Sequence, residues 1–101
     1  MSVRKTRWSK VYESSEEELV ALLQSRGVVA DHWALVEFEE LPTRSLGSNT
    51  TIWLAEGSAT FKVDGKNYSM QPGDTINLPS GSKLQITAGM SGCTCYESLA
   101  Q

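Results

Sequence analysis

The sequence predicts an all-β domain that carries one α-helix near its N-terminus. From residue 33 to residue 99, short runs of strand-forming residues alternate with turn signals, a pattern typical of an antiparallel sandwich or barrel. Before that region, residues 14–27 hold the only clear helical periodicity in the chain. We therefore interpret the chain as a single domain, with an N-terminal arm and helix over residues 1–32 and a β-barrel over residues 33–101.

Length and composition support one globular domain. The chain has 101 residues, of which 40% are hydrophobic and 21% are charged, and a chain of this size buries about two-thirds of its unfolded surface. The formal net charge of -3 argues against a nucleic-acid partner, since such proteins carry a basic excess. No apolar run reaches the length of a signal peptide core or a membrane span, so we expect a cytoplasmic protein with no membrane partner.

The helix is expected over about residues 15–26. Ser14 or Ser15 can cap its start, because each precedes a glutamate by three positions, as in a capping box. Gly27 suits the left-handed residue that ends many helices. The helix must pack its apolar stripe on another element, and that stripe consists of Leu19, Leu22 and Leu23.

Turn residues divide the remainder into short strands. Pro42 ends the first, residues 43–49 are expected to form a loop, and Asp64-Gly65 is the strongest short-range signal for a hairpin. Residues 58–63 alternate small or polar with apolar side chains, as a half-buried strand does. The expected strands are 33–41, 50–55, 58–63, 66–70, 75–78, 83–87 and 93–99.

The turns and strands between residues 52 and 81 resemble the core of a small cupin. The family has two motifs, G-x5-H-x-H-x3/4-E-x6-G and G-x5-P-x-G-x2-H-x3-N, and this chain keeps the closing glycine of the first and the turn residues of the second. The resemblance covers roughly residues 33–99 and implies a short antiparallel barrel of jelly-roll type. The scaffold turns are expected at Gly57, Gly65, Gly73, Pro79 and Gly81.

Other residues occupy the positions at which the family has its metal ligands. Aliphatic, hydroxyl and guanidinium side chains do not offer the imidazole and carboxylate donors that iron, manganese, nickel or zinc prefer. The resemblance therefore implies a scaffold without the usual metal site, and we expect no cofactor. By motif spacing the substitutes are Arg44 and Leu46, or Thr43 and Ser45, for the histidine pair, Thr50 for the glutamate and Leu84 for the last histidine.

A few side chains remain as weak candidates for chemistry. His32 is the only histidine and, with Tyr96, is a weak candidate for acid–base catalysis. Cys93 and Cys95 share one face of a strand, where they are poor disulfide partners and, with His32, weak candidates for a metal site. The favoured interpretation is a surface histidine and two core thiols.

The barrel interior is expected to be mostly aliphatic, either packed shut or open as a pocket for a small apolar or anionic ligand. A buried Arg44 would need an acidic partner or an anionic ligand. Trp53 is expected on the opposite face of its strand, as an anchor for a homodimer. The expected pocket residues are Arg44, Leu46, Thr50, Ile52, Leu54, Ile76, Leu78, Leu84 and Ile86.

These observations favour a metal-free cupin-like protein without catalytic activity, which binds a small molecule or serves as an interaction or regulatory module. The alternative is a cupin enzyme. Such an enzyme would be a metal-dependent oxygenase or isomerase with non-standard ligands, or a cofactor-free isomerase or lyase. The residues indicate no particular ligand or substrate.

Overall fold

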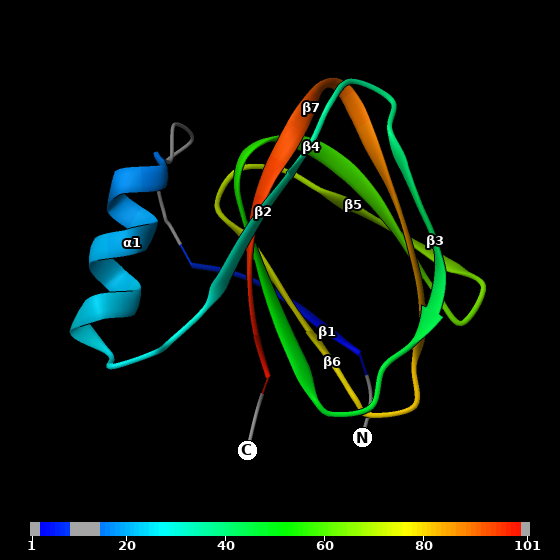
Figure 1. Cartoon of the computed structure of the whole chain (residues 1–101), viewed down its shortest axis with the longest axis horizontal. Coiled ribbons are helices and arrows are strands. Elements are labelled where there is room, and N and C mark those ends of the chain that lie inside the picture. Colours follow the sequence, from blue (N-terminus) through cyan, green and yellow to red (C-terminus); the bar gives the residue numbers. More distant parts are fainter. Residues whose placement is uncertain (1–2, 9–14, 100–101) are drawn as a thin grey trace.

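The computed structural model describes residues 3–8 and 15–99, which form an antiparallel β-barrel with one helix against its outer surface (Figure 1). Seven strands and one helix make up this part of the chain. In order they are β1 (Arg4–Arg7), α1 (Glu16–Ser25), β2 (Asp31–Leu35), β3 (Glu40–Ser45), β4 (Thr50–Val63), β5 (Lys66–Met70), β6 (Asp74–Leu78) and β7 (Lys83–Leu99).

The long strands β4 and β7 hold the barrel together, because they pair with each other and each also pairs with two shorter strands. The path runs β1-β6-β4-β7-β2, with β5 added to β4 and β3 added to β7. Register shifts on β4, between Leu54 and Glu56 and between Gly57 and Ala59, mark β-bulges that bend the strand. At Gly57 φ is 79°, and a Cβ atom would lie 2.0 Å from the carbonyl oxygen of Gly92, so this corner requires glycine.

These bulges explain why the strands differ from the sequence prediction. Strand β4 joins the two segments expected at 50–55 and 58–63, and β7 joins those expected at 83–87 and 93–99. Strand β3 runs through Pro42 into the expected loop, because Pro42 lies in an irregular stretch of the β3–β7 ladder where its missing N–H does not interrupt pairing. Local turn residues therefore mark bends rather than strand ends here.

Other local predictions are confirmed. The β4–β5 hairpin turns at Asp64 and Gly65, whose φ values of 50° and 86° are those of a left-handed two-residue turn.

Strand β1 belongs to the barrel sheet, since it pairs with β6, so the segment expected as an N-terminal arm contributes to the β-structure. Its Lys5 and Arg7 lie 3.6 and 2.9 Å from the buried carboxylate of Asp74.

Helix α1 begins after Ser15, whose side chain accepts a hydrogen bond from the Glu18 amide at 3.2 Å. Its Leu19 and Leu23 are buried against Trp53, which points outward from β4 and is only 7% exposed. The face that carries Trp53 is therefore covered by this chain's own helix, and a homodimer would need a different surface. Within the described residues, no helix has the length and apolar character needed to cross a membrane.

Candidate functional site

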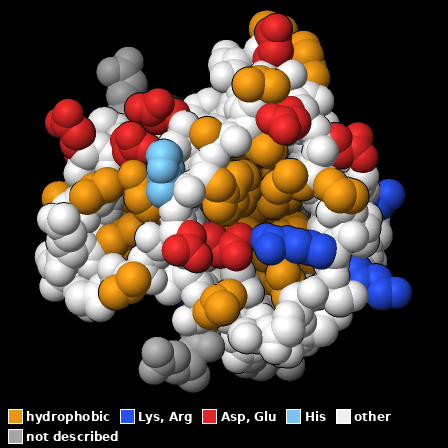
Figure 2. Space-filling model, in the orientation of Figure 1, with side chains coloured by type: hydrophobic (Ala, Val, Ile, Leu, Met, Phe, Trp, Pro, Cys, Tyr) orange, Lys and Arg blue, Asp and Glu red, His pale blue; other side chains and the backbone are white. Residues whose placement is uncertain are grey.

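A cavity of about 530 Å³ opens between strands β2 and β3. Both strands pair with the same edge of β7, β2 along residues 93–97 and β3 along residues 83–87, so they diverge where β7 bends. Figure 2 shows this hollow, in which hydrophobic side chains form the floor beside a cationic and an anionic side chain. Its lining residues are Asp31, Trp33, Ala34, Leu35, Glu39, Leu41, Pro42, Thr43, Arg44 and Glu97.

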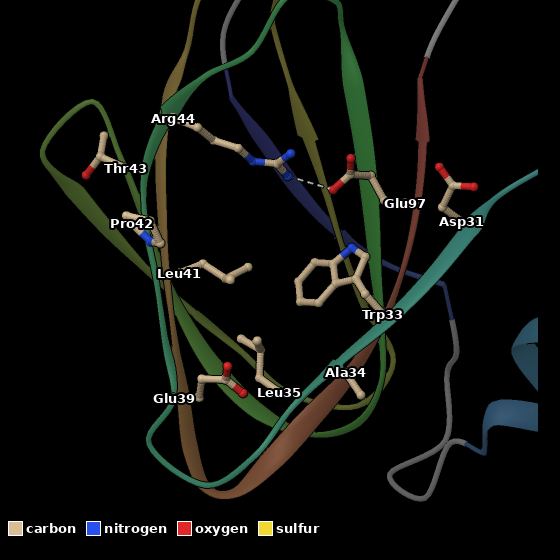
Figure 3. A pocket seen from close by; sticks show the side chains of 10 residues that line it. All are labelled: Asp31, Trp33, Ala34, Leu35, Glu39, Leu41, Pro42, Thr43, Arg44 and Glu97. Carbon is tan, nitrogen blue, oxygen red and sulfur yellow. Dashed lines mark hydrogen bonds and ion pairs between the residues drawn. The ribbon is translucent and has the colours of Figure 1, made fainter.

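Side-chain alternation on β2 directs its larger apolar residues into this space. Trp33 and Leu35 lie opposite Cys95 and Cys93 on β7, and they point inward between the strands (Figure 3). Leu35 is buried, while Trp33 is partly exposed. The indole and the leucine therefore form an apolar wall that the chain itself does not cover completely.

Strand β3 supplies the opposite wall through its irregularity. Leu41 pairs with Ile86 and Arg44 pairs with Leu84, so these two residues are three positions apart on β3 but only two positions apart on β7. The extra residue changes the alternation, and both side chains point into the cavity (Figure 3). A regular strand would have placed Leu41 and Arg44 on opposite faces.

An ion pair spans the cavity. Arg44 Nη2 of β3 lies 2.8 Å from Glu97 Oε1 of β7, and the two side chains are 48% and 16% exposed. Because Glu97 supplies the acidic partner that an inward arginine requires, the side chain of Arg44 needs no anionic ligand.

Two further carboxylates border the cavity. Glu39 closes the turn between β2 and β3, where its Oε1 accepts a hydrogen bond from the Val36 amide at 3.0 Å. Asp31 begins β2 and lies across the ladder from Glu97. With Glu97, they give the described lining of the cavity three carboxylates beside the guanidinium of Arg44.

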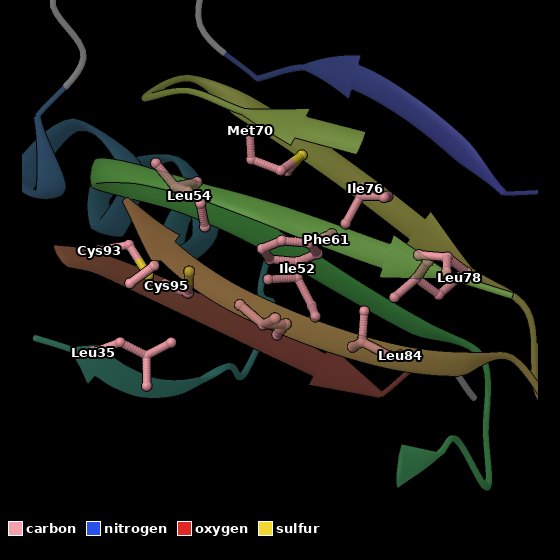
Figure 4. Packing of buried hydrophobic residues seen from close by; sticks show 14 of the residues in the cluster. Leu35, Ile52, Leu54, Phe61, Met70, Ile76, Leu78, Leu84, Cys93 and Cys95 are labelled. Atoms are coloured by element: carbon pink, nitrogen blue, oxygen red, sulfur yellow. The ribbon is translucent and has the colours of Figure 1, made fainter. Parts of the chain in front are cut away.

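Of the pocket residues expected from the sequence, Arg44 alone lines this cavity. The others are buried in the barrel, and the aliphatic ones pack in one cluster with Phe61 and Met70 (Figure 4). Thr50 is buried too, and its hydroxyl donates to the Ser48 carbonyl at 3.0 Å. The expected pocket residues that instead fill the barrel interior are Leu46, Thr50, Ile52, Leu54, Ile76, Leu78, Leu84 and Ile86.

The positions that correspond to cupin metal ligands do not fit a transition metal. Leu46 and Leu84 are core side chains, Thr50 is bonded to the backbone, and Arg44 is paired with a carboxylate. Their atoms offer no imidazole or thiolate donor at this place. Over residues 3–8 and 15–99, no group of three or more His, Cys, Asp or Glu side chains is arranged to hold a metal ion.

The two weak catalytic candidates meet on the outer face. The His32 and Tyr96 rings lie 5.0 Å apart, and His32 Nε2 lies 3.4 Å from Glu16 Oε2 of helix α1. Burial, the charge of Glu16 and a hydrogen bond to it raise the pKa of Tyr96. The arrangement resembles an acid–base pair with a phenol, but it lies on the side of the β2–β7 pair opposite to Trp33, and the cavity is not lined by any of its members.

The two cysteines are core residues. Cys93 and Cys95 are free thiols in the barrel core cluster, directly across the β2–β7 ladder from Leu35 and Trp33. A hydrogen bond with Cys93, together with burial, raises the pKa of the Cys95 thiol. His32 lies on the outer face, so the structure does not bring it together with the cysteines.

Several lining residues were absent from the expected set, chiefly Trp33, Leu41 and Glu97. Trp33 could have been found from the alternation of side chains along β2. Leu41 could have been found from the proline that follows it, which indicates an irregular strand. Glu97 carries no local signal, because its partner Arg44 is 53 residues away along the chain.

The barrel is similar to several solved structures. A DUF861 family protein from Thermotoga maritima has a TM-score of 0.66 and 19% identity, over 98% of this chain and 100% of that one. A cupin superfamily protein from Desulfitobacterium hafniense has a TM-score of 0.63 and 14% identity, over 99% of this chain and 79% of that one. Acireductone dioxygenase from Bacillus anthracis has a TM-score of 0.63 and 14% identity, over 98% of this chain and 78% of that one.

No protein-family model and no curated protein sequence matches the chain. Similarity at these identities extends to the fold and not to activity, since one fold hosts many unrelated functions.

Proposed function

We propose that this protein, a small single domain with the cupin fold, binds a small molecule in the cavity between β2 and β3 and acts through binding rather than catalysis. The observation that carries the proposal is the cavity itself. Its volume of about 530 Å³ is in the usual range for ligand sites, and apolar side chains supply its floor and two walls. A ligand with an apolar body would cover surface on Trp33 and Leu41 that the chain leaves accessible to water.

The chemistry of the lining supports a binding role. The cavity has an aromatic ring, branched aliphatic side chains and four charged groups, and none of its lining residues within 3–8 and 15–99 is a histidine, cysteine, lysine or tyrosine. Two of the charged groups, Arg44 and Glu97, are already bonded to each other. Such a lining orients and holds a ligand.

The proposal is tested by screening a library of small fragments against the isotope-labelled protein by NMR. Hits are expected to shift backbone resonances of β2 and β3 and to leave those of β5 unchanged. Replacing Leu41 with Trp fills the cavity and should abolish binding, whereas Met90→Trp, at a position 75% exposed outside the lining, is the matched control. The proposal fails if no fragment binds here, or if a folded Leu41→Trp protein binds as well as the control.

The enzyme alternative draws on Glu16, His32 and Tyr96. It predicts that fragments found in the screen are chemically converted over many turnovers, and that His32→Ala stops conversion. The binding proposal predicts unchanged fragments in NMR spectra recorded over days. Elemental analysis of untagged protein addresses the metal-dependent form of the alternative.

A further inference from the structure

The charge and shape of the cavity indicate which class of ligand it binds, an inference that rests on the proposed function. We propose that the ligand is a small organic cation, an ammonium group attached to an apolar body. Three features point to such a ligand: the balance of charge in the cavity, the aromatic ring on its wall and the pairing of Arg44 with Glu97.

The cavity carries an excess of negative charge. Among the lining residues that the structure describes, Asp31, Glu39 and Glu97 contribute three carboxylates, and Arg44 contributes the one cationic group. Arg44 and Glu97 neutralise each other at 2.8 Å, which leaves Asp31 and Glu39. Within the described ranges neither of these two takes part in an ion pair. A concave site with unpaired charge of one sign concentrates ligands of the opposite sign.

The wall of the cavity fits an organic cation better than a hydrated metal ion. The Trp33 indole points into the space between β2 and β3 (Figure 3), and tryptophan is the side chain that attracts cations most strongly through its ring. Leu35 and Leu41 lie on either side of that space and would contact an apolar body. A metal ion would need oxygen ligands from several sides, whereas this floor is hydrocarbon.

An anionic ligand is disfavoured by the same groups. Its natural partner is Arg44, so a ligand carboxylate would compete with Glu97, whose side chain is only 16% exposed. Displacing Glu97 would leave a largely buried carboxylate without its partner, which is costly. The incoming anion would also approach Asp31 and Glu39.

The test uses three probes that share one body: phenethylamine, 2-phenylethanol and phenylacetate. Binding is followed by NMR shifts of β2 and β3 at neutral pH, at low and at high salt. The amine is expected to bind about fivefold to tenfold more tightly than the alcohol, and the acid more weakly than either. Added salt should reduce the advantage of the amine.

Two isosteric variants locate the charge. Glu39→Gln loses the charge but keeps an oxygen that can accept a hydrogen bond from the Val36 amide. Asp31→Asn removes the charge at the start of β2 with little change of shape. Each should weaken the amine about threefold and leave the alcohol unchanged. Glu37→Gln is the matched control, because Glu37 lies in the same turn but does not line the cavity.

Equal binding of amine and alcohol would overturn the inference, as would tightest binding by the acid. If none of the three probes binds while the screen still finds fragments in the cavity, the cation is wrong and the proposed function stands. If the screen also finds nothing there, both are wrong.

Discussion

Two tryptophans, on the strands that flank β7, meet different surroundings in this molecule. Trp53 points outward from β4, and Leu19 and Leu23 of helix α1 cover it, so that only 7% of its surface is exposed. Trp33 points inward from β2, yet it lines a cavity and stays partly exposed. The outward ring is thus the better buried of the two, which reverses the ordinary expectation for a barrel.

The difference indicates where the chain completes its own packing and where it does not. Helix α1 buries one aromatic side chain and stabilises the fold through that contact. The divergence of β2 and β3 leaves the other side chain facing open space with no element of the described chain above it. Surface of that kind contributes less to stability and is available to a ligand.

The largest expected effect separates the two rings. Trp53→Ala should lower the free energy of unfolding by about 3–5 kcal/mol, because it opens a cavity under the helix. Trp33→Ala should cost about 1–2 kcal/mol, since part of its surface is already in contact with water. Denaturant unfolding measures both. Equal losses would contradict the comparison.

The next test addresses the cover over Trp53. Leu19→Ala should cost about 2–4 kcal/mol, since Leu19 is completely buried against the barrel. Leu22→Ala, on the same helix but only partly buried, is the control and should cost about 1 kcal/mol. If the two losses are alike in denaturant unfolding, the helix does not bury Trp53 in the way described.

Alkaline pH tests whether the barrel core around Cys95 is sealed from water. The pKa of Cys95 is raised above its ordinary value of 9.0, so the folded protein keeps this thiol neutral while the unfolded chain ionises. The neutral Cys95 thiol therefore contributes its full share to the free energy of unfolding below pH 9.0. That contribution is lost as the pH rises above this value, by at most about 1.4 kcal/mol per pH unit.

The raised pKa of Tyr96 acts in the same direction, because the unfolded phenol also ionises first. The hydrogen bond that raises the pKa of Cys95 lowers the pKa of Cys93, so the two thiols are removed together. Unfolding measured under reducing conditions from about pH 9 to about pH 11 should show a falling stability, with a shallower slope in the double variant Cys93→Ala/Cys95→Ala and in Tyr96→Phe. An unchanged slope in the double variant would mean that the pair titrates in the folded state as it does in the unfolded chain.

The smallest expected effect concerns the helix cap. Ser15→Ala removes the acceptor of the Glu18 amide and should cost about 1 kcal/mol. Ser25→Ala, which removes a hydroxyl that donates to the Leu22 carbonyl in the last turn, is the control with a smaller loss. Binding in the cavity should not change in either variant, and weakened binding in Ser15→Ala would show that the two regions are coupled.

Much of the fold is readable from local patterns. The cap at Ser15, the hairpin at Asp64-Gly65 and the glycine corner at Gly57 each depend on backbone chemistry within a few residues. Strand ends were less predictable, because a proline or glycine marks a bulge as readily as a stop. Pro42 is the clear example, since the strand continues past it.

The candidate site was harder to predict, because it depends on pairs distant in sequence. Arg44 was recognised as the unusual inward charge, but Glu97 is 53 residues away. The acid beside His32 is Glu16 of the helix, which no pattern near His32 in the sequence indicates. Ile52 and Leu84 were both expected in the barrel interior, Ile52 from alternation and Leu84 from its position in the cupin-like motif, and both are buried. Neither pattern tells a filled interior from an open one.

Local chemistry thus settles the fold class of this protein: an antiparallel barrel of short turns and alternating strands with one capped helix. The location of the cavity is decided by tertiary structure, because it depends on how far β2 and β3 diverge along a bent β7. The same holds for the helix over Trp53 and for the partner of Arg44. Packing and long-range electrostatics act between residues that only the folded chain brings together.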